Sequence, residues 1–162
     1  MTTKTLSKVI FFAIVCALSS VSALGQKRAT FTGHWNWAIY GTSKEDLPPA
    51  YKDMDLKEVP AWALDLTLKQ RGQRLSGSFG IVAHYLARVD EGSFSTTIKG
   101  NRATIKLKSN FGGSATVMLT LKGDKLAWKV IRSADQNYFP ESEVLRRLRR
   151  GQKPPYVSDD RQ

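Results

Sequence analysis

The feature that most constrains this chain is a strict alternation of apolar and polar residues, repeated in segment after segment between residues 30 and 132. In residues 61–70, for example, Trp62, Leu64 and Leu66 alternate with small or polar residues. Successive side chains of a β-strand point to opposite faces, so this period predicts strands with one face turned toward a core. The predicted strands are residues 30–40, 61–70, 74–86, 93–99, 102–108, 114–122 and 125–132.

Short connections decide how these strands are joined. Gly100-Asn101 and Gly123-Asp124 are two-residue hairpin signals, and residues 110–113 form a longer turn with two glycines. Parallel neighbours need crossovers of about a dozen residues, so strands joined this closely must be antiparallel. An open sheet would leave an apolar face wet and two edges exposed, and closure removes both problems. The prediction is an all-β, up-and-down meander closed into a barrel of seven or eight strands.

Two segments interrupt the alternation. Residues 41–60 contain Pro48-Pro49 and mixed charge, which predicts a long loop of the kind that often serves as a lid, with one helical turn near residues 54–57. Asp90-Glu91-Gly92 is expected to break a strand. We expect an eighth strand to lie within residues 41–60 or 87–92.

A short helix is expected after the last predicted strand. Pro140 suits the first helical position, and Glu141 suits the positive first turn. Val144, Leu145 and Leu148 then follow at helical spacing. Residues 151–162 are polar and contain proline, so we expect them to form a disordered tail.

The first residues have the organisation of a signal peptide. Lys4 and Lys8 precede the apolar residues 9–18, and Ala23 ends a small-residue cleavage site. The apolar run is shorter than the roughly 20 residues that cross a bilayer. We therefore expect residues 1–23 to be removed, without a transmembrane segment remaining, and residues 24–150 to form one exported domain, periplasmic or extracellular.

The chain is strongly basic, with 25 lysines and arginines against 14 acidic residues and a formal charge of +11. A field of that sign favours an anionic surface or an acidic protein as partner. Nucleic acid is not expected, because the chain carries an export signal and no nucleic-acid motif. Arginines at the end of the predicted helix are the expected anionic-partner patch, although simple complementation of the helix dipole is the alternative. These residues are Arg146, Arg147, Arg149 and Arg150.

Large aromatic side chains fall on the inward face of the predicted strands. An eight-stranded barrel is just wide enough to hold one small ligand, so these residues predict a site for a small apolar or amphiphilic molecule. The alternative is that the same side chains fill the interior and leave a solid core. The expected ligand-binding residues are Trp37, Trp62, Phe79, Tyr85 and Trp128.

Gly33-His34-Trp35 places a Gly-x-Trp motif on the first strand, ahead of the meander and the predicted helix. This layout resembles the lipocalin-like, or calycin, superfamily, in particular small secreted bacterial Gly-x-Trp β-barrel proteins of unassigned function. The resemblance implies that Trp35 packs at the closed end of the barrel beneath a basic side chain from near the last strand. Arg132 has the position in the sequence that this partner requires.

The residues predict no cofactor, metal site or catalytic set. His34 and His84 are expected to face solvent, because as metal ligands they would need a third partner such as Asp65 or Asp90. We find no serine-centred elbow. The sequence favours a non-enzymatic exported protein that binds a small ligand. The alternative is a basic protein–protein interaction module, such as an exported enzyme inhibitor with a solid barrel core.

Overall fold

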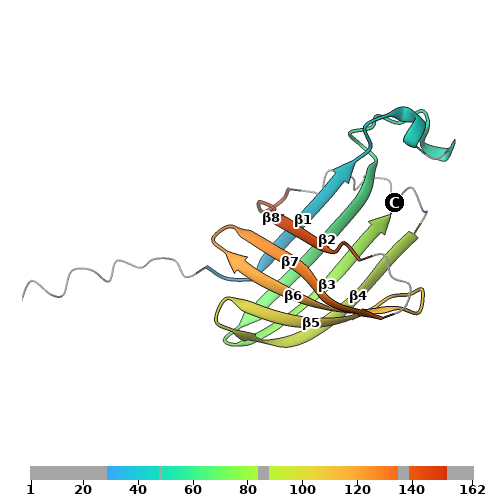
Figure 1. Cartoon of the computed structure of the whole chain (residues 1–162). Helices are drawn as coiled ribbons and strands as arrows, with labels where there is room; N and C mark the ends of the chain where they lie inside the picture. Colours follow the sequence, from blue (N-terminus) through green and yellow to red (C-terminus); the bar gives the residue numbers. More distant parts are fainter. Residues whose placement is uncertain (1–28, 48, 84–87, 135–138, 153–162) are drawn as a thin grey trace, which may run out of the picture.

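The computed structural model describes residues 29–47, 49–83, 88–134 and 139–152. Within them, eight antiparallel strands follow one another around a closed barrel in sequence order, which confirms the predicted all-β meander (Figure 1). The expected signal peptide, residues 1–23, and residues 153–162 of the expected tail lie outside the described residues. The strands are β1 Gly33–Tyr40, β2 Pro60–Arg71, β3 Arg74–Ala83, β4 Arg88–Lys99, β5 Arg102–Lys108, β6 Ser114–Lys122, β7 Lys125–Ala134 and β8 Ser142–Arg147.

The tight turns lie where they were predicted. Gly100 and Gly123 have φ angles of +63° and +61°, a backbone conformation that glycine adopts without strain in two-residue hairpins. The expected break at Asp90-Glu91-Gly92 is wrong, because these residues continue β4. Asp90 takes an inward position in the register with β3, opposite Ile81. Its hydrogen bonds, described below, outweigh the local preference of these residues for a turn.

The predicted C-terminal helix is also wrong, because its central residues form β8. This strand is the eighth one, and it does not lie in residues 41–60 or 87–92. Val144 and Leu145 fit a helical stripe, but in the strand they point to opposite faces: Leu145 is fully buried opposite Leu126, and Val144 is 52% exposed. Pairing with both β7 and β1 satisfies two sheet edges at once, and this tertiary gain overrides the helical signals.

The inward faces of the strands form one apolar core. Leu66, Val117 and Trp128 are 0% exposed, so the predicted alternation is confirmed on three separate strands. Trp37, Trp62, Phe94 and Val130 are partly buried and pack against this core. Burying each large apolar side chain contributes about 1.5–3 kcal/mol, and the barrel is built around this term.

Two seams divide the barrel into the halves β1–β4 and β5–β8. Among the described residues, β4 and β5 share the register pairs Ile98–Ala103 and Lys99–Arg102, next to their hairpin turn. β1 and β8 share Trp35–Arg147 and Asn36–Arg146. Both sets of pairs lie toward the end of the barrel where β1 begins, here called the lower end. Toward the upper end, where β1 ends and β4 begins, both seams diverge (Figure 1).

A buried carboxylate spans the upper part of the β4–β5 seam. Asp90 is 2% exposed and accepts two hydrogen bonds from the turn that joins β5 to β6. The Ser109 hydroxyl donates to Oδ2 over 2.7 Å, and the Asn110 N–H donates to Oδ1 over 2.6 Å. Hydrogen bonds to a charged acceptor are the stronger kind, so this side chain ties the two halves together where the strands no longer pair.

The segment between β1 and β2 contains two short 3-10 helices, Lys44–Asp46 and Pro49–Tyr51. The helical turn expected near residues 54–57 is a hydrogen-bonded turn, in which the Glu58 N–H donates to the Asp55 carbonyl over 2.9 Å. Leu47 and Val59 are buried and anchor the two ends of the segment. Figure 1 shows the segment projecting beyond the ends of β1 and β2.

We expect Asp90→Ala to lower the free energy of unfolding by about 2–4 kcal/mol, because it removes the acceptor of the buried Ser109 hydroxyl and of the partly buried Asn110 N–H. Glu91→Ala is the matched control, since Glu91 is the next residue of the strand and is exposed. That variant should stay within about 0.5 kcal/mol of the parent protein. Urea denaturation measures both values, and equal effects of the two substitutions would contradict a tie at Asp90.

Candidate functional site

The expected ligand-binding aromatics lie at two depths. Trp128 is fully buried, and its indole N–H donates to the Pro140 carbonyl over 2.7 Å. Phe79 is 5% exposed and meets the Phe139 ring edge to face, with centroids 6.2 Å apart. Both side chains are therefore enclosed parts of the core. Tyr85 lies outside the described residues.

Trp37 and Trp62 lie nearer the upper end and keep part of their surface exposed. In the β1–β2 register Trp37 faces Leu64 and Ile39 faces Trp62, so the two indoles are diagonal neighbours on the inward face. Ile39 is 45% exposed although its position in the alternation is inward. Apolar surface on inward positions indicates that side chains do not fill this end of the barrel as they fill the core.

A hollow of about 530 Å³ lies outside the same region, along the β1–β8 seam. It is lined by Trp37 and Tyr40 from β1 and by Val144 and Arg146 from β8, among others. Trp37 therefore borders both the core and the outer surface. Burial raises the pKa of the Tyr40 phenol above its ordinary value.

The Gly-x-Trp motif lies at the lower end. Trp35 is fully buried, and its indole N–H donates to the Phe31 carbonyl over 2.8 Å. The guanidinium that covers its ring belongs to Arg147, whose Cζ lies 4.3 Å from the ring centroid. Arg147 also donates to the carbonyls of Thr32, over 2.9 Å, and of Thr30.

Arg132, the expected partner of Trp35, is exposed on β7 opposite Thr116. The error follows directly from the helix prediction. In a helix Arg147 would leave the barrel wall, whereas in β8 it pairs with Trp35 in the register with β1. The basic side chain implied by the resemblance is therefore present, but it comes from the strand that was not predicted.

The expected arginine patch is divided by the same strand. Arg147 is held over Trp35, whereas Arg146 is exposed on the outer side of β8 opposite Lys125. Arg149 and Arg150 follow the strand and are exposed. Arg146 therefore belongs with the cations of the neighbouring strand rather than with a helix end.

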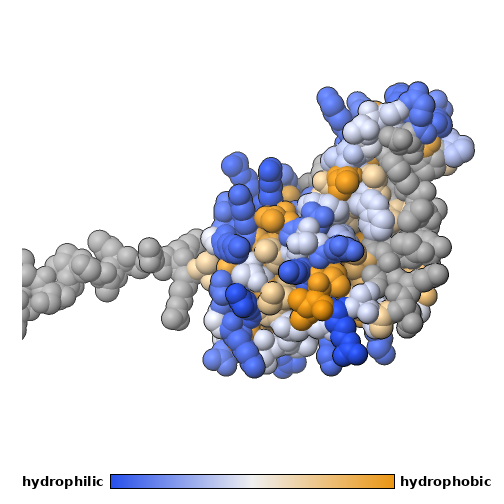
Figure 2. All heavy atoms as spheres, viewed as in Figure 1, coloured by the Kyte–Doolittle hydropathy of each residue, from blue (hydrophilic) through white to orange (hydrophobic). Residues whose placement is uncertain are grey.

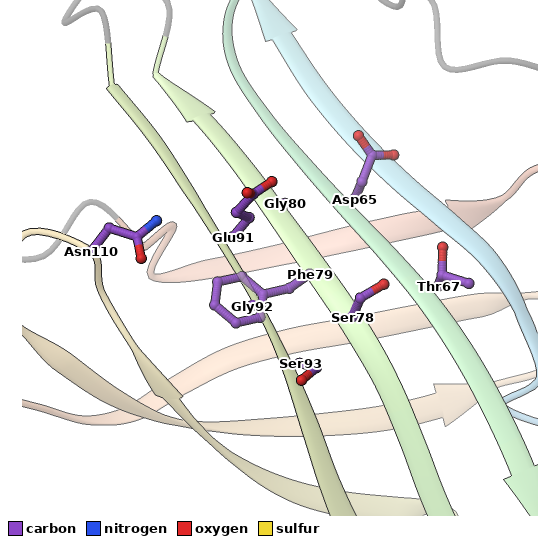
Figure 3. A pocket seen from close by; sticks show the side chains of 9 residues that line it. All are labelled: Asp65, Thr67, Ser78, Phe79, Gly80, Glu91, Gly92, Ser93 and Asn110. Atoms are coloured by element: carbon purple, nitrogen blue, oxygen red, sulfur yellow. The ribbon is translucent and has the colours of Figure 1, made fainter.

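A second hollow, of about 560 Å³, opens on the outer wall of β2, β3 and β4 (Figure 3). The register places Asp65 and Glu91 on either side of Gly80, whose missing side chain leaves the wall open between them. Three hydroxyl residues lie on the next outward row: Thr67, Ser78 and Ser93.

Close contact shapes the edge of this hollow at Gly92. A Cβ atom at Gly92 would lie 2.8 Å from Cε1 of Phe79, so only glycine lets the ring pack against β4 there. Phe79 therefore reaches the wall of the hollow from the core side. The sequence shows that these outward positions are polar. It does not show that they lie side by side, because that depends on the register between the strands.

Asp65 is held from β1 by two neighbours. His34 Nε2 and Asn36 Nδ2 each lie 3.1 Å from its Oδ1. Burial raises the pKa of the Asp65 carboxyl above 3.8, and the Asn36 hydrogen bond and the His34 interaction offset part of that rise. His34 is therefore paired rather than simply facing solvent, and Asp90, its other suggested partner, lies inside the barrel.

The fold and these sites define a closed eight-stranded antiparallel barrel, compatible with a lipocalin-like fold. Comparison with family models, with curated proteins and with solved structures finds no match for the chain. In the described ranges, no three histidine, cysteine, aspartate or glutamate side chains gather where they would hold a metal ion. None of the helices in the same part of the chain has the length and apolarity needed to cross a membrane.

We expect Arg147→Met to lower the free energy of unfolding by about 1–3 kcal/mol, because it removes a cation–π contact and two hydrogen bonds to carbonyls. Arg132→Met removes the same charge from an exposed position and should cost less than about 0.5 kcal/mol. Thermal and urea denaturation compare the two. A larger effect at Arg132 would show that Trp35 does not depend on Arg147.

We expect His34→Gln to raise the pKa of Asp65 further, because it removes the His34 interactions that lower this pKa and keeps a polar side chain. Carbon-13 NMR of the Asp65 carboxyl group measures this pKa, with Thr67→Val as a control on the same wall. Since the folded-state pKa exceeds the unfolded value, the contribution of Asp65 to stability falls as the pH rises through that interval. A lower pKa in His34→Gln would contradict the assigned interaction.

Proposed function

We propose that this chain is a non-enzymatic exported binding protein of the lipocalin-like type, which holds a small apolar or amphiphilic ligand at the upper end of its barrel. The observation that supports this proposal is the group Trp37, Ile39 and Trp62, inward in the alternation yet partly exposed. Indole rings on adjacent strands offer a large apolar surface at little cost in side-chain entropy.

The seams support the same location. β1 and β8 diverge beyond Asn36, next to Trp37, so a ligand can reach the indole without breaking a register pair among the described residues. The lower end, by contrast, is closed by Arg147 over Trp35. Export is proposed on the signal-peptide pattern of residues 1–23.

The polar pairs of the barrel support binding rather than catalysis. Asp90 accepts hydrogen bonds that hold a turn, and Asp65 is engaged by His34 and Asn36 across two strands. Both carboxyl groups therefore form hydrogen bonds that join structural elements. A general acid or base would instead need its carboxyl group to face a substrate.

A basic protein–protein interaction module remains the second candidate. The enclosed positions of Trp128 and Phe79 favour it, because they fill the core with protein side chains. In that case no small ligand enters the barrel, and the exposed arginines Arg146, Arg149 and Arg150 contribute to an outer surface for an acidic partner.

Binding of N-phenyl-1-naphthylamine tests the proposed ligand site. This fluorophore is neutral and apolar, so the net charge of the protein neither attracts nor repels it. We expect saturable binding with a rise and blue shift of its emission. Trp37→Ala and Trp62→Ala should each weaken binding about tenfold, the equivalent of about 1.4 kcal/mol of lost contact. Ile131→Ser is the control, since it removes exposed apolar surface from the outer wall of β7, away from the hollow beside Trp37.

Circular dichroism verifies that each variant remains folded before its affinity is compared. Absence of saturable emission with the parent protein would overturn the ligand proposal and favour the protein-interaction module. The same conclusion would follow if the Trp37 and Trp62 variants bound as tightly as Ile131→Ser.

A further inference from the structure

The outer wall of β5, β6 and β7 carries many exposed cations. All three strands lie within the described residues, and none of them contains an aspartate or glutamate. The exposed cations of these three strands, together with the neighbouring exposed arginine of β8, are here called the basic face. Its members are Arg102, Lys106, Lys108, Lys122, Lys125, Lys129, Arg132 and Arg146.

Strand pairing brings these cations together from distant parts of the chain. Lys122 is opposite Lys125, and Lys125 is opposite Arg146, which gives one row across β6, β7 and β8. The ion pair seen among the described residues joins His34 to Asp65 on β1 and β2. Asp124 lies in the turn between Lys122 and Lys125, but no described carboxylate forms an ion pair with the basic face. Its charge is therefore available to a partner.

Aliphatic side chains lie among the cations. Ala127 and Val144 are opposite each other between Lys125 and Lys129, and Val144 is 52% exposed. Ile131, beside a register shift in β7, is 51% exposed. Figure 2 shows apolar surface in the middle of the face turned to the viewer, with hydrophilic side chains around it.

A hollow of about 470 Å³ lies at one side of this face, where β4 and β5 separate above their hairpin. Lys99 and Arg102 flank it, and Met118 forms apolar lining. Threonine residues complete its wall: Thr96, Thr97 and Thr104. Two cations, hydroxyl donors and a flexible apolar side chain suit a phosphate group attached to a hydrocarbon chain.

We infer that the basic face docks onto the anionic phospholipid surface of a membrane, with Lys99 and Arg102 placed to receive a lipid phosphate. A bilayer presents an extended array of negative charge, which separate lysines meet without the matched geometry that an acidic protein requires. Isolated aliphatic side chains such as Ile131 and Val144 enter the headgroup region. Apart from Val144 and Arg146, which border the hollow beside Trp37, this surface lies outside the proposed ligand site.

Co-sedimentation with lipid vesicles tests the inference, using protein purified from cells that express the full chain. The probes are vesicles of phosphatidylcholine alone and with about one third phosphatidylglycerol. We expect partition onto the anionic vesicles to exceed that onto neutral ones by at least about tenfold in low salt. Most of this difference should disappear in about 0.5 M salt, where screening shortens the range of the charges.

Paired substitutions assign the effect to the face. Lys106→Glu/Lys129→Glu should weaken partition at least about tenfold. The control Lys57→Glu/Lys69→Glu makes the same change of net charge at exposed positions elsewhere and should alter it less than about threefold. Lys99→Ala/Arg102→Ala should weaken partition more than Lys57→Ala/Lys69→Ala does. Ile131→Ser/Val144→Ser, which keeps every charge, should also weaken it.

Three results would overturn the inference. One is equal partition onto neutral and anionic vesicles, and another is an equal effect of the two glutamate pairs. The third is binding to soluble polyglutamate as tight as to vesicles and unaffected by Ile131→Ser/Val144→Ser, which would indicate an acidic protein instead. Binding of N-phenyl-1-naphthylamine should be unchanged in the lysine and arginine variants, so failure here leaves the proposed ligand site separately testable.

Discussion

Closure of the strand ring by β8 is the interaction on which the rest of this structure depends. A strand of six residues pairs with β7 on one side and with β1 on the other. It removes both sheet edges, brings Leu145 into the core and carries Arg147 over the ring of Trp35. Without it, seven strands would expose two edges and one side of the apolar interior. The contact between the first strand and the last thus joins residues far apart in the sequence and also completes the core.

The two halves of the barrel are held differently at the two ends. Backbone pairing and the Trp35–Arg147 contact join them at the lower end, whereas the Asp90 carboxylate joins β4 to the β5–β6 turn higher up. Side-chain bridges are less cooperative than a continuous ladder of backbone hydrogen bonds. Local opening of the barrel wall should therefore require the least free energy in its upper part. The partly exposed indoles of Trp37 and Trp62 lie in that same region, which is where an interior site needs an entrance.

Much of the fold could be predicted because two local signals agreed: alternation within strands, and glycine turns such as Gly100-Asn101 between them. β8 could not, because the spacing of Val144, Leu145 and Leu148 fits a helix better than a strand. Only the available edges of β1 and β7 decide for the strand, in which Leu145 is buried and Val144 is exposed. Arg147 was missed for that reason. The candidate site was predicted in part. Alternation reports which side of the wall Trp128 and Trp37 occupy, but it does not report depth along the barrel, and so it could not separate enclosed from accessible aromatics.

The separation of charge between the two walls has a consequence for how the molecule moves in solution. Cations cover the outside of β5–β7, while Asp65 and Glu91 lie on the outside of β2 and β4. Such a distribution gives the barrel an electric dipole directed across its axis, in addition to its net positive charge. In the field of a negatively charged object the molecule rotates before contact. The wall of β5–β7 then faces that object, and the wall of β2–β4, with the hollow beside Gly80, faces away from it.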